Sequence, residues 1–242
     1  VWKLAAERGV TEVICAPGNP GIAAIARCVA GDVAHPTPLL ETAVRENVDL
    51  TVVGPELPLS LGIADLFAAR GCAIVGPTKA AAALESSKAF AKDVMQRHRV
   101  PTARFEVCDS AAAAHAVIAR GTLGYPIVIK ADGLAAGKGV VIADDRATAD
   151  HTVQLAMIDR CFGAAGDRVV LEECLVGEEA SYFVLADGDA FVRLSSAQDH
   201  KRIFDGDRGP NTGGMGAFSP TPRMTAEVER RVVSQIVRPV LE

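Results

Sequence analysis

The 242-residue sequence lacks several patterns, and each absence excludes a class of protein. No apolar run approaches membrane-spanning length, and no basic stretch followed by an apolar one opens the chain, so we expect a cytoplasmic protein that makes no membrane contact. Basic residues are not in excess, because 25 Lys and Arg stand against 30 Asp and Glu, giving a net charge of −5. This balance disfavours nucleic acid as a partner and favours small molecules.

Cysteine and histidine motifs are also missing. The six cysteines stand in apolar contexts without a Cys-x-x-Cys pair, which predicts reduced core residues rather than disulfides or a zinc site. The five histidines lack metal-ligand spacing, and only His200 lies in a dense polar cluster. The chain has no Gly-x-x-x-x-Gly-Lys-Ser/Thr, which disfavours a Walker-type nucleotidase, and no Gly-x-Gly-x-x-Gly after a first strand.

Residues 126–142 form the most informative segment. Two β-branched runs, Pro-Ile-Val-Ile and Val-Val-Ile, flank a loop in which Gly133, Gly137 and Gly139 allow a close backbone approach. Lys130 ends the first run and Lys138 lies in the turn, so two ammonium groups and backbone N–H donors can converge on one polyphosphate. The segment predicts a β-hairpin that binds a nucleoside triphosphate, with a simple turn and solvated lysines as the alternative.

Helix and strand patterns alternate in the first part of the chain. Apolar runs at 12–16, 50–53 and 72–75 are separated by helical patterns, including one at 22–29, which is the rhythm of a doubly wound parallel sheet. This rhythm leaves a nicotinamide-dependent oxidoreductase open as an alternative. Further on, we expect a helix from Lys88 to Arg97 capped by serine, strands at 168–172, 180–185 and 190–194, and an irregular polar loop at 199–216.

The segment from Glu172 to Glu179 follows a strand and predicts a second part of the site. A strand that runs into an extended connection exposes backbone groups that can pair with an adenine edge, and a later carboxylate can accept ribose hydroxyls. Glu172, Leu175 and Glu179 have this arrangement. A solvated acidic rim is the alternative.

Together these segments resemble the ATP-grasp superfamily and, within it, the phosphoribosylamine–glycine ligase family. The resemblance covers essentially the whole chain and rests most on Lys-Ala-Asp-Gly-Leu-Ala-Ala-Gly-Lys-Gly at 130–139 and Gly-Pro-Asn-Thr-Gly-Gly-Met-Gly at 209–216. Shorter strings at 53–56, 76–78, 87–90 and 196–202 follow in family order. It implies an α/β and α+β fold, with a truncated doubly wound parallel-sheet domain at 1–84 and an incomplete ATP-grasp domain that starts at 85–109, with a lid subdomain at 110–177 and a second subdomain at 178–242.

The resemblance also implies an activity. The protein would be an ATP-dependent ligase that joins glycine to 5-phosphoribosylamine through glycyl phosphate, giving glycinamide ribonucleotide, ADP and phosphate in de novo purine biosynthesis. Because the sequence begins and ends inside helical patterns, we expect a fragment that catalyses little alone and whose Mg²⁺ or Mn²⁺ ligands lie outside it. The alternatives are another ATP-grasp carboxylate–amine ligase and a non-catalytic nucleotide-binding module.

Site residues follow from the same resemblance, and no metal ligand is among them. The catalytic residues would be Lys130, Lys138, His200, Lys201 and Arg202, although for His200 a structural hydrogen bond is an equal alternative. The nucleotide would contact Lys88, Lys130, Asp132, Gly133, Gly137, Lys138, Gly139, Glu172, Glu173, Cys174, Leu175 and Glu179. Substrates would contact Asn19, Gly21, Glu56, Gln198, Asp199, Pro210, Asn211, Thr212, Gly213 and Gly214.

Overall fold

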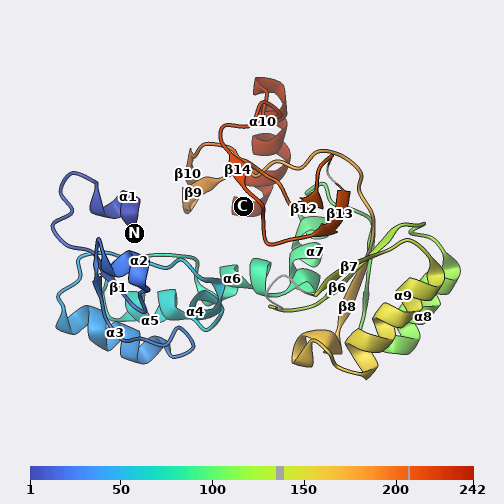
Figure 1. Cartoon of the computed structure of the whole chain (residues 1–242), viewed down its shortest axis with the longest axis horizontal. Coiled ribbons are helices and arrows are strands. Elements are labelled where there is room, and N and C mark those ends of the chain that lie inside the picture. The colour runs from blue at the N-terminus through green and yellow to red at the C-terminus, as the bar shows by residue number, and fades with distance from the viewer. Residues whose placement is uncertain (135–138, 207) are drawn as a thin grey trace. The chain divides into compact units, whose positions relative to one another are not determined.

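The structure is a computed structural model that describes residues 1–134, 139–206 and 208–242, apart from the side chains at positions 210 and 211. The chain divides into two compact units, Val1–Ser86 and Ser87–Glu242. Figure 1 shows the elements of both units along the chain. Across the described residues, no helix combines the length and the apolar character needed to cross a membrane.

Helices and short strands alternate in the first unit. Its elements are α1 (Trp2–Ala5), β1 (Ile14–Cys15), α2 (Pro20–Ala23), β2 (Arg27–Cys28), α3 (Pro36–Arg45), β3 (Thr51–Val52), α4 (Glu56–Ser60), α5 (Ile63–Ala69), β4 (Ile74–Val75) and α6 (Lys79–Ser86). β1 pairs with β2 and β3 pairs with β4, both in parallel. Helix α5 supplies most of the buried apolar side chains, with Phe67 only 1% exposed. Parallel pairing and helical connections confirm the predicted α/β pattern.

One local prediction in this unit is wrong. The sequence at 22–29 predicts helical material, but the helix ends at Ala23 and the chain returns as the strand β2. β2 pairs in parallel with β1, and the Arg27 guanidinium donates to Glu12 at 2.7 Å and to Glu46 at 2.8 Å. These partners are distant in sequence and therefore leave no local signal.

The second unit begins with a helix and a mixed segment of strands and helices. Its first elements are α7 (Lys88–Arg97), β5 (Phe105–Cys108), α8 (Ala111–Arg120), β6 (Ile127–Ala131), β7 (Val140–Ala143), α9 (Arg146–Val153), a π-helical turn (Gln154–Ile158), a 3₁₀ turn (Gly163–Asp167) and β8 (Val169–Glu173). The predicted helix 88–97 is confirmed, and the Ser87 hydroxyl caps it by accepting the Phe90 N–H at 3.1 Å. The predicted hairpin is also confirmed, with Lys130 opposite Val140 in the register of β6 and β7.

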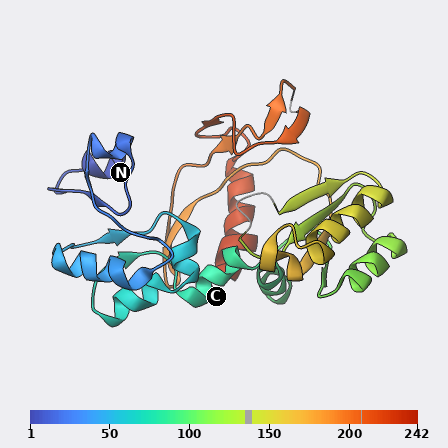
Figure 2. The same ribbon diagram turned by 60° about the horizontal axis from the view of Figure 1, so that its bottom comes forward.

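Strands β5, β8, β6 and β7 form a four-stranded antiparallel sheet in that order. Helices α8 and α9 pack against each other and against this sheet, whereas α7 packs against β8 (Figures 1 and 2). Alternation along β6 buries Ile127, Ile129 and Ala131 and leaves Val128 and Lys130 partly exposed on the other face. The sheet therefore has an apolar face and a face that carries charge.

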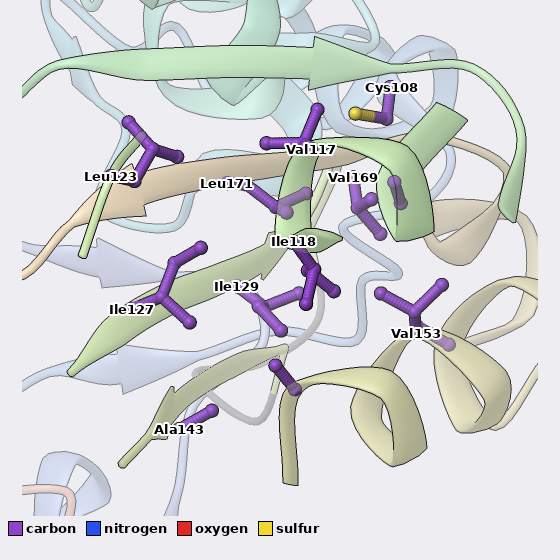
Figure 3. Close-up of a cluster of buried hydrophobic side chains, with 13 residues drawn as sticks. Cys108, Val117, Ile118, Leu123, Ile127, Ile129, Ala143, Val153, Val169 and Leu171 are labelled. Carbon is purple, nitrogen blue, oxygen red and sulfur yellow. The ribbon is translucent and has the colours of Figure 1, made fainter. Parts of the chain in front are cut away.

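The apolar face is the core of the second unit. Ile127 and Ile129 of β6 and Leu171 of β8 meet Val117 and Ile118 of α8, as Figure 3 shows. Leu171 is fully buried and Ile129 is 1% exposed. These side chains fix the register of the sheet, because a slip by one residue would turn Lys130 into the core.

The positions of the cysteines agree only in part with the sequence prediction. All six cysteines are free, as expected, but only Cys108 is buried, and Cys28 and Cys161 are exposed. Burial raises the pKa of the Cys108 thiol to about 11. The prediction of six core cysteines is therefore wrong for the two exposed ones.

The remainder of the second unit consists of short strand pairs and a helix. Its elements are β9 (Val184–Asp187), β10 (Ala190–Arg193), β11 (Gln198–Asp199), β12 (Arg202–Phe204), β13 (Arg208–Asn211), β14 (Ala217–Phe218), α10 (Ala226–Val232), a π-helical turn (Val233–Val237) and α11 (Arg238–Leu241). β9 pairs with β10, β11 with β14, and β12 with β13, all antiparallel. The prediction that 199–216 is irregular is therefore wrong in part, because β12 and β13 form a hairpin within it.

Candidate functional site

The charged face of the sheet carries the central feature of the site. Lys130 of β6 lies opposite Val170, and Glu172 of β8 lies opposite Val128, so Lys130 and Glu172 are diagonal neighbours on one face. The Lys130 Nζ is 2.9 Å from the Glu172 Oε1. From α7, the Lys92 Nζ reaches the other oxygen, Oε2, also at 2.9 Å. We call these three side chains the Lys92–Glu172–Lys130 triad.

The triad is buried unevenly. The side chains of Glu172 and Lys92 are 5% and 8% exposed, whereas that of Lys130 is 28% exposed. The Glu172 Oε1 is buried and has no hydrogen-bond partner, because Lys130 approaches it without hydrogen-bonding geometry. Two ammonium groups and one carboxylate leave the triad with a charge of +1, and Lys130 is the member that solvent or an anion can reach.

Lys92 is held by two further contacts. Its Nζ donates to the Thr102 Oγ1 at 2.7 Å and lies 5.2 Å from the centroid of the Phe105 ring. A lysine is rarely buried unless its charge is paired, and here it has a carboxylate, a hydroxyl and an aromatic face. These contacts fix the ammonium group beneath the sheet.

The amino-terminal end of α7 is joined to the base of the glycine-rich loop. The Asp132 carboxylate accepts from the Ser87 hydroxyl at 3.1 and 3.2 Å and from the Ala89 N–H at 3.1 Å. The Lys88 Nζ donates to the Gly133 carbonyl at 2.9 Å. A carboxylate at a helix amino terminus is favoured by the helix dipole. Asp132 therefore holds the loop, and Lys88 and Lys130 both lie beside it.

A backbone hydrogen bond joins the two ends of the glycine-rich loop at its base. The Ala131 N–H donates to the Gly139 carbonyl at 2.8 Å. Gly133 has a φ of +132°, which side chains rarely adopt, and a Cβ there would lie 3.1 Å from the Ala165 Cβ. Gly137 and Lys138, both predicted site residues, lie outside the described residues.

The segment after β8 is held in place at Glu173 and is exposed to solvent from Leu175 onward. The Glu173 carboxylate accepts from the Arg104 backbone N–H at 2.8 Å and from its Nε at 2.6 Å, and these contacts hold the pKa of Glu173 below its usual value. Cys174 is half-buried, and Leu175 and Val176 are 70% and 95% exposed. An apolar surface beside backbone that has left the sheet suits a flat, hydrogen-bonding ring such as adenine.

Glu179 and Lys201 meet in the second part of the unit. The Lys201 Nζ is 2.6 Å from the Glu179 Oε2 and 3.8 Å from the Asp199 carboxylate. The hydrogen bond from Glu179 raises the pKa of Lys201. Both side chains are exposed enough for solvent to screen the pair, so it contributes little to folding. The predicted ribose carboxylate and a predicted catalytic lysine thus contact each other.

Further predicted residues, both catalytic and substrate-binding, make contacts within the local structure of 198–221. The His200 N–H donates to the Gly216 carbonyl at 2.9 Å, and its ring lies 5.5 Å from that of Phe218. The Arg202 Nη1 donates to the Gly209 carbonyl at 2.6 Å. The Thr212 hydroxyl donates to the Lys201 carbonyl at 2.9 Å and accepts the Gly214 N–H at 3.0 Å. The Gln198 side chain accepts from the Thr221 hydroxyl at 3.0 Å. Gly213 is exposed, and the side chains of Pro210 and Asn211 are not described.

The three predicted residues of the first unit lie at helix starts. Asn19 caps α2 by accepting the Ile22 N–H at 2.9 Å, Gly21 lies in the first turn of that helix, and Glu56 is the first residue of α4. Their contact with a substrate stays a prediction.

Sequence reasoning missed Lys92 and Arg104. Lys92 carried a signal, because it lies four residues after Lys88 on the face of α7 that also buries Ala89. Arg104 carried none, since its partner Glu173 is 69 residues away. Within the described residues, no group of three or more His, Cys, Asp or Glu side chains could hold a metal ion.

The comparisons with known proteins identify the family of the chain. The family model "Phosphoribosylglycinamide synthetase, ATP-grasp (A) domain" matches residues 86–242, so the second unit is an ATP-grasp domain. The N domain of the same synthetase matches residues 1–85. The chain therefore belongs to the phosphoribosylglycinamide synthetase family.

Individual relatives support the same assignment. The chain is 52% identical over 240 residues to the phosphoribosylamine–glycine ligase of Ralstonia nicotianae, covering 99% of this chain and 56% of the relative. It is 51% identical over 243 residues to that of Xylella fastidiosa, with coverages of 100% and 56%. A crystal structure of this ligase from Thermotoga maritima is 31% identical, with a TM-score of 0.79 and coverages of 99% and 56%. The chain thus spans about half the length of these relatives.

Proposed function

We propose that the protein is an ATP-dependent carbon–nitrogen ligase that joins glycine to 5-phosphoribosylamine in de novo purine biosynthesis, in the cytoplasm. The relatives' names supply the two substrates. The structural observation that carries the proposal is the triad, which presents a partly exposed ammonium group next to a glycine-rich hairpin and an exposed apolar segment. Such a combination suits a purine nucleotide with several phosphates.

The residues present fit a nucleotide. The orphaned Glu172 Oε1 faces Lys130, whose ammonium group is free to move toward a phosphate, and Lys88 lies at the same loop. Leu175 and Val176 would cover the adenine ring, and the backbone at Cys174 and Leu175 would pair with its edge. Glu179 would accept the ribose hydroxyls, with Lys201 released from it.

Each group then has a role in the reaction. Bound ATP supplies the γ-phosphoryl group that activates the glycine carboxylate. Lys88 and Lys130 neutralise phosphate charge, which is the main contribution that a protein makes to phosphoryl transfer. Lys201 and Arg202 hold the acceptor groups, and the glycine-rich loop excludes water from a reactive acyl group. Lys138, which lies outside the described residues, remains a predicted contact.

A divalent ion, Mg²⁺ or Mn²⁺, belongs to the proposal because ATP-grasp ligases use such ions. The described residues contain no group of three or more His, Cys, Asp or Glu side chains that could hold it, so the side chains that the structure describes do not fit a complete metal site. We derive no step of the reaction through the ion. We propose that its ligands lie outside the 242 residues.

The test is ADP release by the full chain as the gene encodes it. We expect release only when ATP, glycine and 5-phosphoribosylamine are all supplied, and little or none from the 242 residues alone. Substituting other amino acids or bicarbonate for glycine tests for another ATP-grasp ligase. Equal release without glycine would contradict the proposed reaction, and ATP binding without any release would indicate a non-catalytic nucleotide-binding module.

Glu179 and its neighbour Glu178 allow a matched comparison. We expect Glu179→Gln to weaken ADP binding about tenfold or more, because a carboxylate that accepts two hydroxyls is lost. Glu178→Gln should leave binding unchanged, since Glu178 pairs instead with Arg223 at 2.5 Å. Both variants should change the free energy of unfolding by less than about 1 kcal/mol, because both pairs are exposed. Calorimetric titration with ADP measures the difference, and equal effects of the two changes would exclude a ribose contact by Glu179.

A further inference from the structure

We propose that Lys92 is a positioning residue that neutralises Glu172 and so leaves the charge of Lys130 available to a polyphosphate. The inference rests on the proposed nucleotide site and adds a role for a residue that no motif singled out. The position of Lys130 raises a difficulty for phosphate binding. Lys130, the partly exposed ammonium group of the triad, stands 2.9 Å from a carboxylate of opposite charge.

An isolated Lys130–Glu172 pair would be a poor phosphate site. Its charges sum to zero, and a buried carboxylate with one partner would hold that partner strongly, because opposite charges attract more in a medium of low dielectric constant. An incoming phosphate would then have to compete with Glu172 for the ammonium group of Lys130. The Glu172 side chain is 5% exposed, so water cannot take over the role of a partner.

Lys92 changes this balance. Its Nζ lies 2.9 Å from the second oxygen of Glu172, and its side chain is 8% exposed, so it cannot itself reach a ligand in solvent. With Lys92 present, the triad has a charge of +1 and Glu172 keeps one partner when Lys130 turns away. The geometry at Oε1 agrees with these separate roles of Lys92 and Lys130. The Glu172 Oε1 accepts no hydrogen bond from Lys130, so Lys130 can turn toward a ligand without breaking one.

The surroundings of Lys92 fix it for this role. Thr102 and the Phe105 ring hold the ammonium group in place, and Phe105 lies opposite Glu172 in the register of β5 and β8. α7 also carries Lys88, one helical turn before Lys92, which donates to Gly133 at the loop. One helix therefore supplies a cation to the loop and another to the buried carboxylate.

The test compares ADP with adenosine, because only ADP reports on phosphate binding. Titrations use the full chain as the gene encodes it. We expect Lys92→Met to raise the dissociation constant of ADP at least about tenfold and that of adenosine less than about twofold, since the triad loses its net charge. The double variant Lys92→Met/Glu172→Gln regains a charge of +1, so its ratio of ADP to adenosine affinity should return to within about threefold of the wild-type ratio. The ratio is compared because Glu172 is itself a predicted nucleotide contact, whose loss would weaken both ligands.

Thr102→Val is the structural control. It removes a hydrogen bond to Lys92 and leaves every charge in place, so it should lower Tm without changing the ratio of ADP to adenosine affinity. The inference is overturned if Lys92→Met weakens both ligands equally, if the double variant keeps the ADP-to-adenosine affinity ratio of Lys92→Met, or if Thr102→Val lowers that ratio as much as Lys92→Met does. None of these titrations contains glycine, so a failure of the proposed ligase reaction would show only in the ADP-release assay.

Discussion

Lys130→Met is expected to lower kcat/KM for ATP by about a hundred to a thousandfold, the usual effect of removing one group that stabilises charge in a transition state. Lys130 is the only member of the triad with substantial exposure, at 28% of its side chain, and it lies at the base of the glycine-rich loop. Without it, the triad reduces to a neutral Lys92–Glu172 pair. Steady-state ADP release by the full chain, with saturating glycine and 5-phosphoribosylamine, measures the change.

The fold should survive this substitution. Glu172 keeps Lys92 at 2.9 Å, and the methionine side chain fills nearly the same volume as the lysine stem. A thermal unfolding curve close to that of the wild type would establish this. Lys3→Met is the matched control, because Lys3 is an exposed lysine in the first unit, with 77% of its side chain accessible. Activity of Lys130→Met within about threefold of this control would exclude Lys130 from the phosphate site.

Leu171→Ala is expected to lower the free energy of unfolding by about 3 kcal/mol or more, within the range for buried leucines. Leu171 is fully buried in the central strand β8, among the side chains of α8 and β6. The sheet flanks it on both sides and leaves little room for the cavity to collapse. Urea unfolding monitored by circular dichroism measures the loss.

Leu175→Ala is the same side-chain truncation four residues later. It should weaken ligand binding and leave the free energy of unfolding almost unchanged. Leu175 is 70% exposed, so its truncation should change the unfolding free energy by less than about 0.5 kcal/mol. It should instead weaken adenosine binding about threefold to tenfold, because apolar cover for the adenine ring is lost. A large stability loss in Leu175→Ala, or unchanged adenosine binding, would show that this segment does not form the adenine site.

Local signals account for the parts of the fold that the sequence predicts well. Ser87 marks the start of α7 because it satisfies a free N–H group, and the β-branched runs at 127–131 and 140–143 predict the hairpin because both flank a glycine-rich turn. The sequence also predicts Lys130 as a site residue from its position in that hairpin, and its binding role stays a prediction.

Contacts between distant segments account for what sequence analysis missed. The triad joins residues 92, 130 and 172, and only the strand register and the packing of α7 bring them together. The hairpin of β12 and β13 was missed because polar and glycine residues in 199–216 hide the pairing of Arg202 with Asn211. Likewise, nothing near Glu173 in the sequence indicates that Arg104 holds its carboxylate.

The strand order β5-β8-β6-β7 has a consequence for synthesis on the ribosome. β8 is the last of the four strands to emerge, yet it lies between β5 and β6 and pairs with both. Until Val169–Glu173 leaves the exit tunnel, β5 and the β6–β7 hairpin each present an unpaired edge, which other chains could join. The strand that ends this exposure also brings Glu172, so the nascent chain gains its central core strand and its buried ionic contacts in a single event.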